Sequence, residues 1–84
     1  MNTEIYCKAG SVELTEKEAF QIYDEKKYIA TSTAVYQPHY SQAQKAVYFS
    51  KVLTVKGIAR RGRFYTLTAD EINRILGKEI LSEF

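Results

Sequence analysis

Residues 41–68, SQAQKAVYFSKVLTVKGIARRGRFYTLT, contain the patterns on which the prediction of the fold depends. The first four residues have the Ser-x-x-Gln form of a capping box, in which the serine side chain accepts a hydrogen bond from a first-turn N–H group. A stripe of small and apolar residues follows at three- and four-residue spacing, and this spacing predicts a helix over 41–53. The stripe consists of Ala43, Ala46, Val47, Ser50 and Leu53.

The second half of this stretch, residues 54–68, has the pattern of a β-hairpin. Gly57 stands where a preceding helix would have its C-cap. Residues 58–61 are predicted to form one strand and residues 63–67 the other. Gly62 is predicted to form the turn between them, because glycine tolerates the positive φ of a tight hairpin turn.

Two further capping boxes mark helix starts on either side of this stretch. Thr15–Glu18 predicts a helix that fades near Lys26, and Thr68–Glu71 predicts a second helix. Gly77 is expected either to end or to kink this second helix. The apolar face of the second helix consists of Ile72, Ile75, Leu76 and Ile80.

Two strands are predicted nearer the N-terminus. Thr3–Lys8 alternates well enough for a strand that closes at Gly10-Ser11, and residues 28–37 are rich in Thr, Val, Ile and Tyr, as strands are. A helical interpretation of residues 28–37 stays open. The sequence therefore predicts an α+β fold, with residues 1–84 as a single small domain of order β-α-β-α-β-β-α. At this length folding buries only about 60% of the surface of the unfolded chain.

The charges are segregated along the chain. Residues 1–25 carry a net charge of −4 and residues 70–84 a net charge of −2, whereas residues 26–69 carry eight lysines and arginines and no acid. One interpretation is that the acidic residues flank helix starts, where the helix dipole favours them, and that residues 26–69 lack acids by chance. The other is a basic face that meets a polyanion such as a nucleic-acid backbone. Seven of the eleven aromatic residues lie in the same block, and aromatic rings can stack on bases.

Residues 56–68, KGIARRGRFYTLT, resemble the wing of winged-helix DNA-binding domains, in which a glycine and a run of bases around a turn precede an aromatic residue and Leu-Thr. This resemblance implies that residues 41–53 are the recognition helix and that duplex DNA is the partner. It implies groove contacts by Gln42, Gln44, Lys45 and Tyr48. The arginines of the wing would then contact the DNA backbone or the minor groove. Upstream, residues 28–37 depart from the family pattern, which leaves open an α+β domain whose hairpin extends a sheet.

Several classes of protein are disfavoured by what the sequence lacks. With one cysteine, Cys7, the chain forms no internal disulfide and no cysteine-based zinc cage. His39 is the only histidine and is expected in a loop, and no phosphate-binding glycine motif is present, so we expect neither enzymatic activity nor a cofactor or metal. The first residues do not resemble a secretory signal and no apolar run approaches the ~20 residues of a membrane span, which predicts a cytoplasmic protein.

The leading hypothesis is a small nucleic-acid-binding accessory or regulatory protein of a phage or mobile element, expected to gain affinity as a homodimer. Its predicted contact residues are Arg60, Arg61, Arg63, Lys45, Lys51, Lys56, Gln42 and Tyr48. The alternative is an inhibitor that binds a host nucleic-acid-binding defence complex, because residues 40–46 resemble helix starts in small phage proteins such as anti-CRISPR inhibitors. A third hypothesis is an assembly protein whose aromatic face is an oligomer interface.

Overall fold

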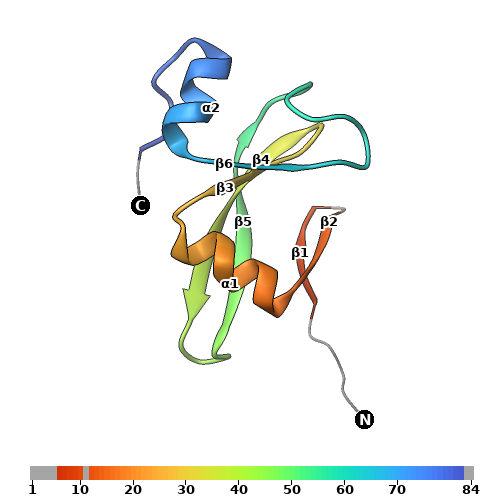
Figure 1. The fold of residues 1–84 in the computed structure, drawn as a ribbon, viewed down its shortest axis with the longest axis vertical. Coiled ribbons are helices and arrows are strands. Elements are labelled where there is room, and N and C mark those ends of the chain that lie inside the picture. The colour runs from red at the N-terminus through yellow and green to blue at the C-terminus, as the bar shows by residue number, and fades with distance from the viewer. Residues whose placement is uncertain (1–5, 11, 83–84) are drawn as a thin grey trace.

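The computed structural model describes residues 6–10 and 12–82. The described chain has the element order β-β-α-β-β-β-β-α (Figure 1). The predicted α+β class is confirmed, but the predicted order of elements is wrong: it lacks a second strand before the first helix, and it has a helix where the chain forms a strand. The elements are β1 (Tyr6–Ala9), β2 (Val12–Thr15), α1 (Glu16–Asp24), β3 (Tyr28–Ala30), β4 (Ala34–Ser41), β5 (Ala46–Thr54), β6 (Tyr65–Leu67) and α2 (Ala69–Leu76).

The strands form two antiparallel sheets. β1 and β2 make a separate hairpin, and the other strands form a sheet of order β5-β4-β3-β6. The pairing of β4 with β5 extends from Ala34 opposite Thr54 to Ser41 opposite Ala46. One irregularity interrupts it, and there Val52 is the extra residue of β5.

The larger sheet is covered on both faces near β3 and β6. α1 lies on one side of these strands and α2 on the other (Figure 1). Successive strand residues point to opposite faces, so Ile29 of β3 packs with one group of residues and its neighbours Tyr28 and Ala30 pack with another. The first core contains Ala9, Val12, Leu14, Ile22 and Ile29, and the second core contains Tyr28, Ala30, Val35, Ala69 and Ile72.

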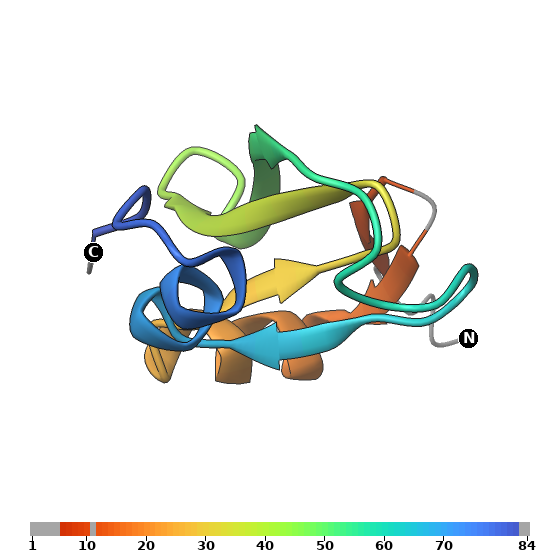
Figure 2. The same ribbon diagram turned by 90° about the horizontal axis from the view of Figure 1, so that it is seen from above.

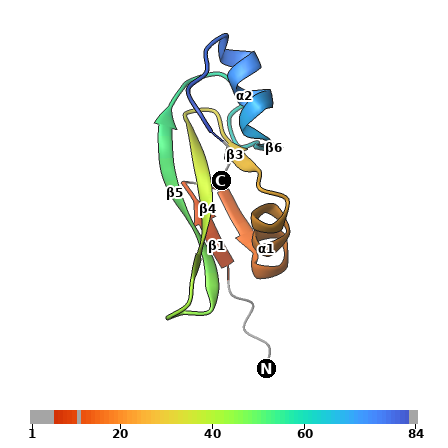
Figure 3. The same cartoon turned by 90° about the vertical axis from the view of Figure 1, so that its left-hand side faces the viewer.

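The far end of the β4–β5 hairpin packs against α1. Figure 3 shows α1 beside one face of this hairpin. Buried Ala19 of α1 packs with buried Val47 of β5, and the Tyr40 ring lies 5.8 Å from the Phe20 ring and 6.2 Å from the Tyr23 ring. The opposite face of the hairpin end is open around Tyr48, which is 49% exposed.

Both threonine-based helix starts are confirmed. The Glu18 N–H donates to Thr15 Oγ1 over 3.2 Å and the Thr15 N–H donates back to Glu18 Oε1, while Thr68 and Glu71 make the same pair of bonds. Gly77 ends α2 in the left-handed conformation at φ 70°. These starts were predictable because each depends on contacts within a single turn.

The predicted helix over 41–53 is wrong. Residues 46–54 form the strand β5, and residues 42–45 form the turn that joins it to β4. The Gln44 N–H does donate to Ser41 Oγ, but the bond closes a tight turn, and Lys45 follows at φ 51°. Valine and aromatic residues in β5 favour a pleated strand, and the long pairing with β4 outweighs the local helix signal.

Other predicted strands need smaller corrections. Residues 28–37 contain two strands and a turn instead of one strand, and the predicted hairpin over 58–67 is wrong because β6 pairs with β3. The strand expected at Thr3–Lys8 is found as β1 from Tyr6, whereas residues 3–5 lie outside the described part. The sequence analysis missed β2.

The capping contact of α2 predicts a pH dependence of stability. The hydrogen bond from the Thr68 backbone, with a further one from its hydroxyl, lowers the pKa of the Glu71 carboxyl. A lowered pKa stabilises the fold above the pKa of the unfolded chain, about 4.3, and this contribution is lost as pH falls through the folded value. Glu71→Gln keeps the acceptor but does not titrate. Urea unfolding from pH 7 to pH 3 should therefore show a smaller loss of stability for this variant than for wild type.

The exposed Glu79, which caps no helix, provides the control for this measurement. Glu79→Gln should follow the wild-type pH dependence more closely than Glu71→Gln does. Equal pH dependence in wild type and Glu71→Gln would contradict the role given to the capping carboxylate.

Candidate nucleic-acid interface

The basic loop, residues 55–64, connects β5 to β6 and is anchored where it begins. The Val55 N–H donates to the Thr33 carbonyl over 3.1 Å, and the Gly57 N–H donates to the Ser32 carbonyl over 3.0 Å. The β3–β4 turn that accepts these bonds is fixed in turn by Thr31, whose hydroxyl bonds the backbone of Ala34. The start of the loop is therefore attached to the central strands.

Apolar side chains anchor the rest of the loop. Ile58 packs against the second core, Ala59 is buried, and Phe64 packs against the first core. Between Ala59 and Phe64 the chain turns tightly, with Gly62 at φ 80°, and the Arg63 N–H donates to the Arg60 carbonyl over 2.9 Å. The turn predicted at Gly62 is confirmed, but residues 58–61 before it do not form the predicted strand.

Within residues 6–10 and 12–82, no carboxylate pairs with the arginines of this turn. Arg60, Arg61 and Arg63 are exposed, and the ion pairs of the described residues lie elsewhere. These pairs are Lys8–Glu13, Lys27–Glu25 and Arg74–Asp70. Figure 2 shows the loop projecting at the end of the molecule opposite α2. The guanidinium groups are therefore free to bind an external anion.

A surface hollow of about 350 Å³ opens beside the turn. It is lined by Arg60, Arg63, Phe64 and Tyr65, so two arginines and two aromatic residues border the same hollow. Phe64 is half-buried against the first core, whereas Tyr65, the next residue, is 51% exposed. Guanidinium groups bind phosphate oxygens and an exposed ring can stack on a base, so the lining suits a nucleotide.

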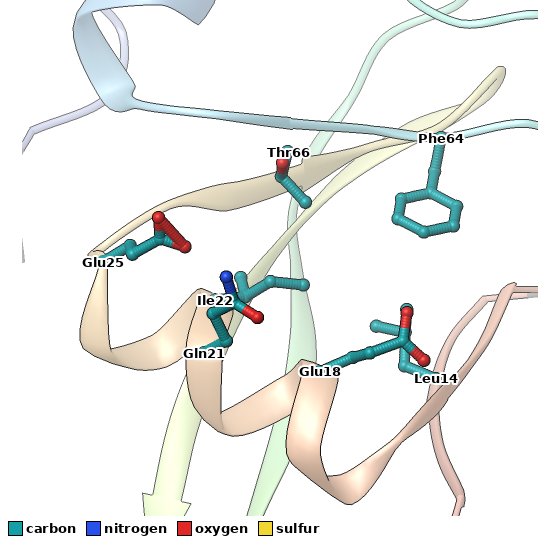
Figure 4. A pocket seen from close by; sticks show the side chains of 7 residues that line it. All are labelled: Leu14, Glu18, Gln21, Ile22, Glu25, Phe64 and Thr66. Carbon is teal, nitrogen blue, oxygen red and sulfur yellow. The ribbon is translucent and has the colours of Figure 1, made fainter.

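A second hollow, of about 170 Å³, lies between α1 and β6 and has the opposite charge (Figure 4). Its apolar lining consists of Leu14, Ile22 and Phe64, and Glu18 and Glu25 of α1 add carboxylates. Phe64 lines both hollows and so separates a basic side from an acidic one. A polyanion in the basic hollow is therefore repelled from α1.

The other predicted contact residues do not all join this site. Lys56 is exposed within the basic loop, and Lys51 is exposed on β5. Lys45 and Gln42 are exposed in the turn at the opposite end of β5, and the nine residues of that strand span about 30 Å (Figure 1). The predicted site is thus divided into a loop group and a distant turn group.

The sequence analysis missed a contact on the open face of the β4–β5 hairpin. His39 lies in β4, not in a loop, and its ring stacks on Tyr48 of β5 with 5.1 Å between ring centroids. His39 Nε2 and Ser50 Oγ are 2.6 Å apart. The expectation that Tyr48 would enter a groove from a helix is wrong, because Tyr48 belongs to a strand. The cross-strand register that joins these residues was hidden by the helix prediction.

The described residues contain no group of three or more His, Cys, Asp or Glu side chains that could hold a metal ion. Among them, no helix is both long and apolar enough to cross a membrane. No protein-family model, curated protein or solved structure matches the chain.

Proposed function

We propose that this chain is a nucleic-acid-binding protein, and not an enzyme, whose basic loop contacts the phosphate backbone. The observation that carries the proposal is a set of three exposed arginines, free of carboxylate partners among the described residues, on a loop anchored at both ends. Lys56 adds a fourth cation to the same loop. Anchoring reduces the conformational entropy that the loop loses on binding.

The loop replaces the predicted recognition helix as the element that contacts the ligand. α1 begins with Glu16 and Glu18, and α2 begins with Asp70 and Glu71. These carboxylates stabilise the helix N-termini but repel phosphate. The two described helices are therefore poorly suited to enter a DNA groove.

A salt titration tests this proposal. If each of the four loop cations neutralises one phosphate, the slope of log affinity against log salt is about −3.6 on duplex DNA and about −2.8 on a single strand. Fluorescence anisotropy with labelled oligonucleotides of random sequence measures both slopes. If neither duplex nor single strand binds at about 50 mM salt, or if the slope is near zero, the proposal is contradicted.

A further inference from the structure

We infer that the hollow beside the Gly62 turn receives an unpaired nucleotide, so that the protein prefers single-stranded nucleic acid to duplex. This inference rests on the proposed function and specifies its ligand. It differs from the expectation of duplex DNA, which relied on a helix over 41–53 where the chain forms the strand β5.

The composition and size of the hollow suit one nucleotide. Arg60 and Arg63 can hold a phosphate while a base lies on the exposed ring of Tyr65. Its volume, about 350 Å³, is within the range of small-molecule sites, roughly 300–1,000 Å³. A site of this size accommodates a single nucleotide and not a base pair flanked by its neighbours.

A base can stack on Tyr65 more readily from a single strand than from a duplex. Inside a duplex both faces of a base are already stacked, and bringing one onto Tyr65 would require flipping it out, at a cost of a few kcal/mol. A single strand presents its bases without this cost. The free ring face of Tyr65 therefore contributes to binding of a single strand but not of an intact duplex.

The basic loop lacks the regular structure with which proteins contact bases in the major groove of a duplex. The major groove admits a helix or a two-stranded ribbon. Residues 58–64 form neither, and β6 pairs with β3 instead of with the loop. Glu18 and Glu25, which line the hollow beyond Phe64, also disfavour a path of phosphates along α1.

The test compares two exposed tyrosines. Tyr65→Leu removes the ring in the hollow, and Tyr48→Leu is the matched control because Tyr48 is 49% exposed but lies on β5, outside the hollow. The probes are an oligothymidine of about 12 nucleotides and a duplex of equal length, titrated at the same salt concentration. Circular dichroism verifies that each variant is folded.

Tyr65→Leu should lower affinity for the oligothymidine about tenfold and leave affinity for the duplex and the salt slope unchanged, since stacking contributes about 1–3 kcal/mol per base. Tyr65→Phe and Tyr48→Leu should bind like wild type. Photo-crosslinking with a 4-thiothymidine oligonucleotide gives a readout on the unaltered protein, and the crosslink should map to residues 60–65.

The outcomes separate the inference from the proposed function. Tighter binding of duplex than of oligothymidine, an equal effect of both leucine variants, or a crosslink confined to residues 39–48 would overturn the inference while the proposed function stands. Failure of both probes to bind at low salt would overturn the proposed function as well.

Discussion

Replacing Arg60, Arg61 and Arg63 together with alanine is expected to lower affinity for nucleic acid by more than tenfold at moderate salt. Three of the four loop cations are removed, so the slope of log affinity against log salt should approach that of a single contact, about −0.7 to −0.9. Stability should change little, because the three side chains are exposed and make no ion pair with the described residues. Anisotropy titrations and urea unfolding measure the two effects separately.

A matched variant removes the same charge elsewhere. Lys17, Arg74 and Lys78 are exposed and lie outside the acid-free block, and changing all three to alanine also shifts the formal net charge from +2 to −1. This control should retain most of the affinity. Equal losses in the two triple variants would mean that binding depends on overall charge and not on the basic loop. Unfolding of the loop variant would show instead that its arginines are structural.

Ile72→Ala is expected to cost about 2–5 kcal/mol of the free energy of unfolding, because the side chain is 0% exposed in the second core and its removal leaves a cavity. A domain of this kind has about 5–15 kcal/mol in total, so the loss is a large fraction. Urea unfolding followed by circular dichroism measures it.

Ile75→Ala in the same helix is the comparison, since Ile75 is 57% exposed. Its effect should stay within about 0.5 kcal/mol, because alanine is a good helix former and little burial is lost. Similar destabilisation by both variants would be incompatible with the packing of α2 against the second core.

The two correct helix starts and the incorrect one have nearly the same local sequence pattern. Thr15 and Thr68 each have a glutamate three residues later, within a segment that continues as a helix, and their hydrogen bonds close within one turn. Ser41 makes only the bond to the Gln44 N–H, which a turn also permits. The choice at this position depends on β4, eight of whose residues pair with β5, and a local pattern does not contain that information.

The part of the site that consists of charged side chains was predictable, because unpaired charged groups lie on the surface. The arginines around Gly62 lie on the surface, as predicted, because burying an unpaired charge is costly. The hollow was not predicted, since an aromatic residue can be buried or exposed, and the local sequence does not indicate that Tyr65 is 51% exposed whereas Tyr28 is buried. Lys45 and Gln42 were predicted to join the loop because a helix over 41–53 is shorter than a strand with the same number of residues. The strand β5 instead places them far from the loop.

The basic loop is also connected to α2 through the second core. Ile58 packs against the core to which α2 contributes Ala69 and Ile72, although α2 lies at the other end of the molecule (Figure 2). If binding of nucleic acid to the basic loop, as proposed, holds Ile58 in the second core, then binding and the folding of α2 favour each other by the same free energy. Under the proposed function, α2 would then contribute to affinity without contacting a phosphate.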